Sequence, residues 1–312
     1  MLKVGNKIKN YFHEFCKEID IKVNDDYRVE GKYLFHCENL WNISTNLISE
    51  RFILDKNGVI LTKYPEPIGL QYNPAYVAYY GLINFNRYLD TKELKYIEKF
   101  NSSLDWIRKN AILFKYKNII CKKFVYGFEW MNGESVLKKG WCSAMAQGLI
   151  ASLLIRGYYY YDDNNFLELA KETINLFSID IENGGVRAKF KEYIYFEEYP
   201  SYPLSMVLDG ALFALVGIYE LSKIDSSYKA DLEKGLAFIE DNFFIWNYNN
   251  RWTKYGVFNK NQFLSTNSYH QLNLILLDFF KNKKLLNIPD IKVSNKYLMA
   301  IINFFIIIKS KT

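Results

Sequence analysis

The sequence predicts an all-α fold, an (α/α) toroid of helical hairpins with a small N-terminal α/β appendage. From Tyr72 onward, long helical patterns alternate in character: apolar helices rich in small and aromatic residues are followed by charged helices. The apolar helices begin near Pro74, Cys142, Pro203 and Leu264, at intervals of 68, 61 and 61 residues. This repeat favours hairpins arranged around an axis, with the apolar helices inside. An open solenoid is the alternative, and it would need more equal repeats.

The chain divides, on this interpretation, into an appendage at 1–60 and a toroid at 61–312, because no long polar linker interrupts it. The appendage opens with an amphipathic helix. The run RFILDKNGVILTKY at 51–64 then places the turn residues 55–58 between two β-like segments, which predicts a hairpin.

The charged helices each carry a single apolar stripe, at 94–107, 167–177 and 232–243, and are therefore expected to cover the outside. The apolar helices are each entered through a polar or aromatic loop. All of these loops should open onto one rim, which makes that rim the default binding site. Glycines within the apolar helices cost about 1 kcal/mol each against alanine, so we expect close helix packing there.

Composition and charge limit the function classes. Half of the residues are apolar and 18% are aromatic, including 26 tyrosines. Tyrosines in such number suit a surface that binds sugar rings, although they could also simply coat the helices. The net charge of +6 is modest and spread along the chain, which argues against a nucleic-acid partner and only weakly favours an acidic substrate.

The four cysteines lie far apart without a CxxC pair, and the three histidines are scattered, so the sequence predicts reduced thiols and no metal site. No signal-peptide pattern is visible at the N-terminus. The apolar run at 297–309 is too short for a membrane span of about 20 residues and predicts a buried terminal helix. We therefore expect a cytoplasmic protein without an integral membrane segment.

The stretch YIYFEEYPSYPLSMVLDGALFALVGIYEL at 193–221 is the strongest candidate for a catalytic site. Glu197 and Glu198 precede Tyr199, and Pro200 and Pro203 stiffen the approach to an apolar helix. A carboxylate and a phenol are thereby held together, and positioning of this kind can supply several kcal/mol of a reaction barrier. A solvated acidic loop near a helix N-terminus is the alternative interpretation.

Several residues at the helix entrances are candidates for lining a groove, since amides bind hydroxyl groups and aromatic rings stack on sugar faces. Core packing is the alternative for the aromatic residues, and helix capping for Ser143. His270 is more simply a core histidine than an acid. The substrate-binding candidates are Tyr72, Asn73, Trp141, Ser143, Gln147, Arg187, Glu197 and His270.

Four blocks of this sequence resemble the C-terminal catalytic domain of the glucuronyl 5-epimerases, which turn D-glucuronate into L-iduronate within heparan-type polysaccharides. The blocks are GLQYNPAYVAYYGLINFNRYL at 69–89, GWCSAMAQGLIASLLIRGY at 140–158, NGGVRAKF at 183–190 and YFEEYPSYPLSMVLDGALFALVGIYEL at 195–221. Several blocks in order are stronger than one motif. The resemblance, over about 55–277, implies an (α/α) toroid, a polymeric uronate substrate, no redox cofactor and a homodimer.

The family's catalytic glutamate and tyrosine correspond by this resemblance to Glu198 and Tyr199, and a second tyrosine to Tyr255. The family has an arginine three residues further on, where this chain has Phe258. A third tyrosine, in the family pattern YHxxHIxQL, falls on Leu264, because this chain reads LSTNSYHQL there. Tyr269 and His270 are the nearest possible replacements.

Inversion at carbon 5 of a uronate removes a proton beside a carboxylate and returns one from the opposite face, so two proton-transfer groups are needed. We expect Glu198 to take or give the proton on one face and Tyr255 on the other, with Tyr199 donating a hydrogen bond to the substrate carboxylate; a permutation of these roles is the alternative. The substrate would be an acidic polysaccharide or a lipid-linked oligosaccharide. A polysaccharide lyase on the same fold and a non-catalytic uronate-binding protein are the rival predictions.

Overall fold

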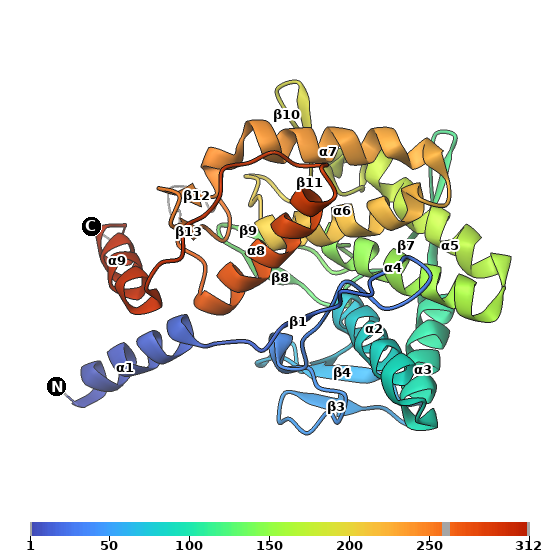
Figure 1. The fold of residues 1–312 in the computed structure, drawn as a ribbon, viewed down its shortest axis with the longest axis horizontal. Coiled ribbons are helices and arrows are strands. Elements are labelled where there is room, and N and C mark those ends of the chain that lie inside the picture. The colour runs from blue at the N-terminus through green and yellow to red at the C-terminus, as the bar shows by residue number, and fades with distance from the viewer. Residues whose placement is uncertain (1, 258–262, 311–312) are drawn as a thin grey trace.

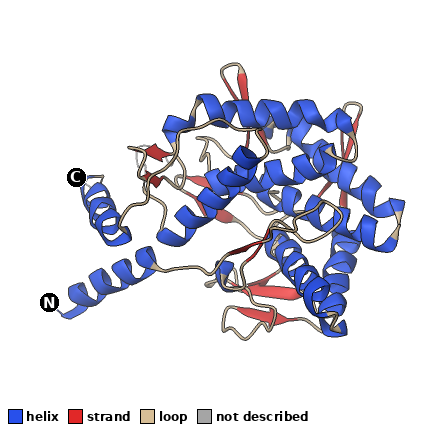
Figure 2. Cartoon of the chain, viewed as in Figure 1, coloured by secondary structure: helices blue, strands red, loops and turns tan. Residues whose placement is uncertain are grey.

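The computed structural model describes residues 2–257 and 263–310, and helices make up most of its regular structure (Figures 1 and 2). Helix pairs follow one another along the chain, and the shorter strands form small separate sheets. The helices are α1 (Leu2–Cys16), α2 (Pro74–Thr91), α3 (Leu94–Asn110), α4 (Ala144–Tyr161), α5 (Asn164–Ile174), α6 (Leu208–Ser222), α7 (Lys229–Asp241), α8 (Asn267–Asn282) and α9 (Lys296–Lys309).

The strands of the described residues pair only with antiparallel neighbours. The hairpin predicted around residues 55–58 is present, with Phe52 opposite Thr62. The hairpins that follow α3 and precede α6 were not predicted. The strands are β1 (Lys22–Val23), β2 (Phe35–His36), β3 (Phe52–Leu54), β4 (Ile60–Lys63), β5 (Leu70–Gln71), β6 (Ile112–Tyr116), β7 (Ile119–Lys123), β8 (Trp130–Asn132), β9 (Ser135–Leu137), β10 (Arg187–Phe190), β11 (Tyr193–Phe196), β12 (Asn247–Tyr248) and β13 (Trp252–Thr253).

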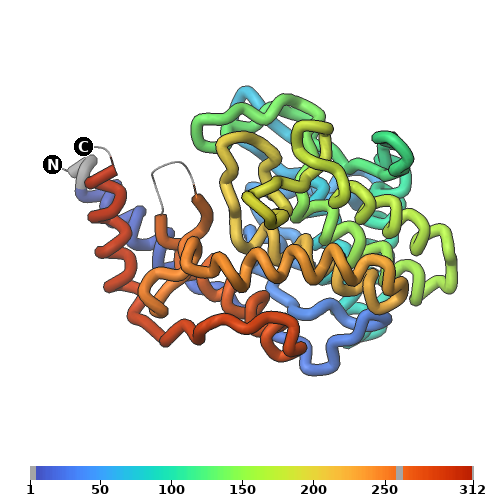
Figure 3. Tube along the Cα trace, turned by 90° about the horizontal axis from the view of Figure 1, so that it is seen from above, coloured from blue at the N-terminus to red at the C-terminus, as the bar shows by residue number. Residues whose placement is uncertain are grey.

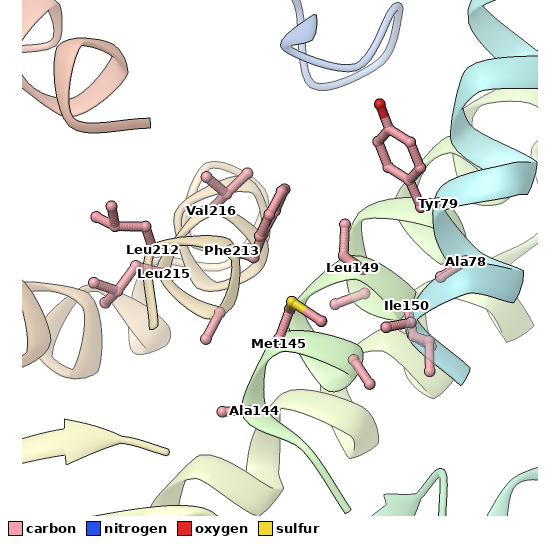
Figure 4. Close-up of a cluster of buried hydrophobic side chains, with 14 of the residues drawn as sticks. Ala78, Tyr79, Ala144, Met145, Leu149, Ile150, Leu212, Phe213, Leu215 and Val216 are labelled. Atoms are coloured by element: carbon pink, nitrogen blue, oxygen red, sulfur yellow. The ribbon is translucent and has the colours of Figure 1, made fainter. Parts of the chain in front are cut away.

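Apolar and charged helices pack as the alternating pattern predicts. Helix α4 contacts both α2 and α6, α8 contacts α6, and α3, α5 and α7 each pack on the apolar helix that precedes them. Figure 4 shows side chains of α2, α4 and α6, among them Tyr79, Leu149 and Phe213, meeting in the interior. A Cβ at Gly217 would lie 2.5 Å from the carbonyl oxygen of Gly148, so only glycine allows α4 and α6 to approach this closely.

Local capping decides where two of the apolar helices begin. Asn73 accepts hydrogen bonds from the backbone of Ala75 and Tyr76, and Pro74 occupies the first helical position of α2. The Ser143 hydroxyl accepts from the N–H of Ala146 at the start of α4. Helices α6 and α8 begin later than predicted. Before α6, Met206 has a positive φ and its N–H donates to Glu197, and before α8, Leu264 forms a β-bridge with Lys254.

A buried ion pair joins α4 to α6. The guanidinium of Arg156 donates to both carboxylate oxygens of Glu220, at 2.9 and 2.8 Å, and both side chains are fully buried. The hydroxyl of Tyr27 also donates to Glu220, at 3.1 Å. These bonds satisfy charges that would otherwise be costly to bury.

Residues 17–60 run along the same hydrophobic core as the helix pairs: Tyr33, Leu34 and Phe35 are buried in it. The division of the chain at residue 60 stays a prediction. Helix α9 differs from the expectation of a buried terminal helix, because only one of its faces is covered, by α1 and by Trp252 and Leu264. Among the described residues, no helix is both long and apolar enough to cross a bilayer.

Candidate active site

A pocket of about 280 Å³ lies where the first turns of α2, α4, α6 and α8 meet. Each of the four loops expected to share a rim contributes to it. Its wall is mostly aromatic, with two carboxyl groups and one guanidinium. The lining residues are Trp41, Arg51, Tyr64, Asn73, Tyr76, Tyr126, Phe128, Trp130, Trp141, Met145, Glu198, Tyr199, Asp209, Tyr255 and Tyr269.

Glu198 and Asp209 form the acidic part of the pocket, and both are almost fully buried. Oε2 of Glu198 and Oδ1 of Asp209 have no hydrogen-bond partner among the described residues. Burial, and then the charge of Asp209, raise the pKa of Glu198 well above its usual range, while Tyr199 as a hydrogen-bond donor opposes the shift. Burial raises the pKa of Asp209 to about 7. Such shifts are typical of functional sites.

Glu197 has a different place from its neighbour, because it does not line the pocket. Its carboxylate accepts hydrogen bonds from the hydroxyl of Ser205, at 2.8 Å, and from the N–H of Met206, at 3.0 Å. Burial raises its pKa to about 7. Glu197 therefore ties the loop that carries Glu198 to the segment before α6.

Tyr199, Tyr255 and Tyr269 line the pocket close enough to Glu198 for its charge to act on their phenols. The rings of Tyr255 and Tyr269 meet edge to face with centroids 5.0 Å apart, and Tyr199 lies 5.8 Å from the ring of Trp141. Burial is the main cause that raises the pKa of each phenol well above its usual range. All three are therefore neutral hydrogen-bond donors when the pocket is empty.

Arg51 is the only cation among the described residues that line this pocket. Its guanidinium donates to the hydroxyl of Tyr76 at 3.2 Å and lies 5.5 Å from the centroid of the Tyr76 ring. The other face of the pocket is aromatic: Trp141 stacks on Tyr126 with centroids 3.8 Å apart. The pocket thus combines one positive group with flat apolar surfaces, a combination suited to an acidic sugar.

Asn73 connects the aromatic wall to α2. Its side chain donates to the hydroxyl of Tyr64, at 2.8 Å, and accepts from that of Tyr126, at 3.2 Å, while also capping the helix. The Asn73 amide therefore fixes the hydroxyl groups of Tyr64 and Tyr126 relative to the first turn of α2.

A comparison with protein families identifies the chain. Residues 117–297, more than half of the sequence, match the family described as D-glucuronyl C5-epimerase C-terminus. The chain belongs to this family. The matched segment of this C5-epimerase family member contains Trp141, Glu198, Tyr199, Asp209 and Tyr269. Arg51 precedes it.

Two curated relatives match shorter stretches. A D-glucuronyl C5-epimerase of Caenorhabditis elegans is 44% identical over 90 residues, which cover 29% of this chain and 15% of that protein. An uncharacterized protein of Methanocaldococcus jannaschii is 33% identical over 106 residues, 33% of this chain and 34% of its own length. The chain therefore matches only a minor part of either relative.

The position at which the resemblance places the family's third tyrosine, Leu264, has a structural role. Leu264 is buried against α1 and α9, and its N–H donates to Oδ1 of Asn303 at 2.9 Å. Tyr269 instead supplies a phenol to the pocket from the first turn of α8. Phe258, at the position where the resemblance places an arginine, lies outside the described residues.

Several predicted substrate-binding residues lie away from the pocket of this family member. The hydroxyl of Tyr72 donates to Asp55 at 2.7 Å, on a separate surface hollow. Arg187 pairs with Asp180 at 2.6 Å. His270 stacks on Trp252 with centroids 3.8 Å apart, and burial lowers its pKa to about 4.

Ser143 and Gln147 also have internal partners. Ser143 caps α4. The Gln147 side chain accepts from the N–H of Phe124 and donates to the carbonyls of Lys122 and Thr173, so it links α4 to the segments beside it. Of the predicted residues, the structure therefore brings together Asn73, Trp141, Glu198, Tyr199 and Tyr255 around the pocket.

Sequence reasoning missed Arg51 and Asp209. Arg51 lies in the least regular part of the chain, where the hydrophobic pattern does not indicate which way a side chain points. Asp209 could have been found, because a carboxylate among apolar residues in VLDGALFALV is expensive to bury without a purpose.

Proposed function

We propose that this protein epimerises carbon 5 of uronate residues in a polysaccharide, converting D-glucuronate into L-iduronate. The supporting observation is that the carboxyl of Glu198 and the phenols of Tyr199 and Tyr255 line one aromatic pocket that also holds Arg51. We further propose that the helix pairs form an (α/α) toroid around this pocket, as the family resemblance implies.

Glu198 is the proposed base. Its carboxylate takes the proton from carbon 5, and the electron pair left behind delocalises into the substrate carboxylate. The O–H of Tyr255 then gives its proton to the opposite face of carbon 5, which leaves a phenolate. The cycle closes when the proton held by Glu198 is returned to Tyr255, directly or through solvent. The raised pKa of Glu198 favours this role, because a more basic carboxylate is a stronger proton acceptor.

Arg51 and Tyr199 are the proposed partners of the substrate carboxylate. Charge builds on that carboxylate as the proton leaves, so donors aimed at it stabilise the transition state more than the ground state. A guanidinium presents parallel donors that match two carboxylate oxygens, which suits Arg51 to this role.

A polymeric substrate is supported by two hollows that share lining residues with the pocket. One, of about 190 Å³, shares Trp41, Arg51 and Tyr269 with it. The other, of about 640 Å³, shares Trp141 and adds Lys138 and Lys139. Neighbouring sugars of an acidic chain would occupy these hollows while one uronate is held in the centre.

The test is to incubate the protein with a heparosan-type polymer in heavy water and to follow deuterium at carbon 5 by NMR. Glu198→Gln should abolish incorporation, whereas Glu168→Gln, on an exposed outer helix, should leave it unchanged. Undiminished incorporation by Glu198→Gln would contradict the assignment. Ultraviolet absorbance of an unsaturated uronate would indicate a lyase, and binding without exchange would indicate a glycan-binding protein.

A further inference from the structure

Helices α1 and α9 lie side by side and extend away from the helix pairs (Figures 1 and 3). Polar bonds lock them together: the hydroxyl of Tyr11 donates to the carbonyl of Ala300 and accepts from Asn303, both at 3.0 Å. Asn303 in turn accepts from the N–H of Leu264. The pair is therefore a fixed projection of the molecule.

The outer face of α9 is an apolar stripe open to solvent. Leu298, Ile301, Phe305 and Ile308 are 47%, 44%, 59% and 44% exposed, and their spacing of three or four residues places them on one side of the helix. The opposite side packs against α1 through Met299. A helix that is apolar on both sides is normally covered on both, so this stripe indicates a binding surface.

The charges of the two helices favour an anionic occupant. Helix α1 carries three lysines and one glutamate in its sequence. Helix α9 has a lysine at each end and no carboxylate, and its first lysine, Lys296, pairs with Glu18. Lys7 and Lys9 are exposed and flank Ile8, which is 39% exposed. A two-fold contact between copies would bring both sets of lysines to one interface, where they would repel. An anionic surface has no such cost.

We propose that the α1–α9 pair docks on an anionic lipid surface. The apolar stripe of α9 enters the headgroup region, and Lys7 and Lys9 of α1 pair with lipid phosphates, as in helices that lie in a membrane interface. Trp252 and Leu264 belong to the cluster that anchors the pair, so the docked helices would hold the rest of the molecule at the lipid surface. The docking itself does not depend on the proposed reaction.

Vesicle flotation tests this directly. The protein should float with vesicles of equal parts phosphatidylcholine and phosphatidylglycerol and bind pure phosphatidylcholine at least about tenfold more weakly. The double substitution Ile301→Gln with Phe305→Gln should weaken binding to the anionic vesicles about tenfold or more. Two apolar side chains that would be buried in the lipid are then replaced by polar ones. Leu94→Gln, an exposed apolar residue on α3, is the matched control and should bind as the wild type does.

The charge arm uses Lys7→Gln with Lys9→Gln, which should weaken binding to the anionic vesicles alone, by about tenfold or more. Thermal melting of each variant establishes that it is folded. If the α9 variant does not fold, the variant with both lysines replaced serves as the test. The proposal fails if the wild type does not float, or if folded variants bind as well as it does. It also fails if light scattering shows a dimer that the α9 variant converts to monomer.

Discussion

The carboxyl of Glu198 lies against Gly210, so closely that a Cβ at position 210 would be 2.5 Å from Oε2 of Glu198 and 2.6 Å from its Cβ. The first turn of α6 thus packs directly against the side chain of Glu198, the proposed base. A side chain there would displace the carboxyl, because backbone cannot move away as a flexible side chain can.

Gly210→Ala should therefore abolish activity without unfolding the protein. A displacement of about 1 Å at a reacting group can cost about 100-fold in rate, so we expect deuterium incorporation to fall by at least about that factor. Gly5→Ala is the control, because open space surrounds that position in α1. A Gly210→Ala protein with the wild-type exchange rate would show that Glu198 needs no such placement.

Asp209→Asn should shift the pH dependence of the reaction. The proposed base acts when ionised, so kcat/KM rises with pH as Glu198 loses its proton. Asp209 raises the pKa of Glu198 by like-charge repulsion, and its removal should move that rise to lower pH. The rate of deuterium exchange measured as a function of pH tests this prediction. If the rise on the acidic side stays at the same pH, Asp209 does not act on Glu198.

Arg51→Gln should weaken both substrate binding and the reaction. Arg51 would pair with the substrate carboxylate once the sugar covers it. Loss of one member of such a covered charge pair typically costs about 2–5 kcal/mol, which predicts a fall in kcat/KM of about 30-fold or more. Arg51→Lys should recover part of it, since a lysine keeps the charge without the planar fork. Arg28→Gln, outside the pocket, is the control. Equal kinetics for all four proteins would exclude Arg51 from the site.

Tyr269→Phe tests whether α8 supplies the phenol that the family resemblance places at Leu264. The substitution keeps the ring that packs on Tyr255 and removes only the hydroxyl, so the fold should persist. If the phenol bonds to substrate, the exchange rate should fall by about 10-fold or more. Tyr297→Phe, at an exposed position on α9, is the control and should have no effect. A wild-type exchange rate in Tyr269→Phe would show that the Tyr269 hydroxyl does not take the place of that tyrosine.

Arg156→Met should destabilise the protein by about 3–5 kcal/mol, because it leaves Glu220 charged and buried without its partner. Combining it with Glu220→Gln should recover part of that loss. Denaturant unfolding provides the measurement, with the exposed pair Lys229 and Glu233 as a control whose disruption costs at most about 1 kcal/mol. A single substitution that costs no more than the control would contradict the role of the pair.

The alternation of helices was readable from the sequence because each outer helix buries one stripe, as Leu167 and Ile174 do in α5, whereas α4 and α6 are apolar all round. The start of α6 could not be read from the sequence. Its start shifts to Leu208 because the carboxylate of Glu197 bonds to Ser205 and Met206, a contact across a loop that periodicity does not report.

The sequence by itself determined the helical class, the family and the segment that carries Glu198 and Tyr199, because these depend on local periodicity and on short motifs. Only the tertiary structure decided that Arg51, Asp209 and Tyr269 join that segment around one pocket, while Tyr72 and His270 lie elsewhere. The physical reason is that the direction of a side chain depends on which distant segment packs beside it. Residues far apart in the chain therefore become neighbours through burial of the core that they share.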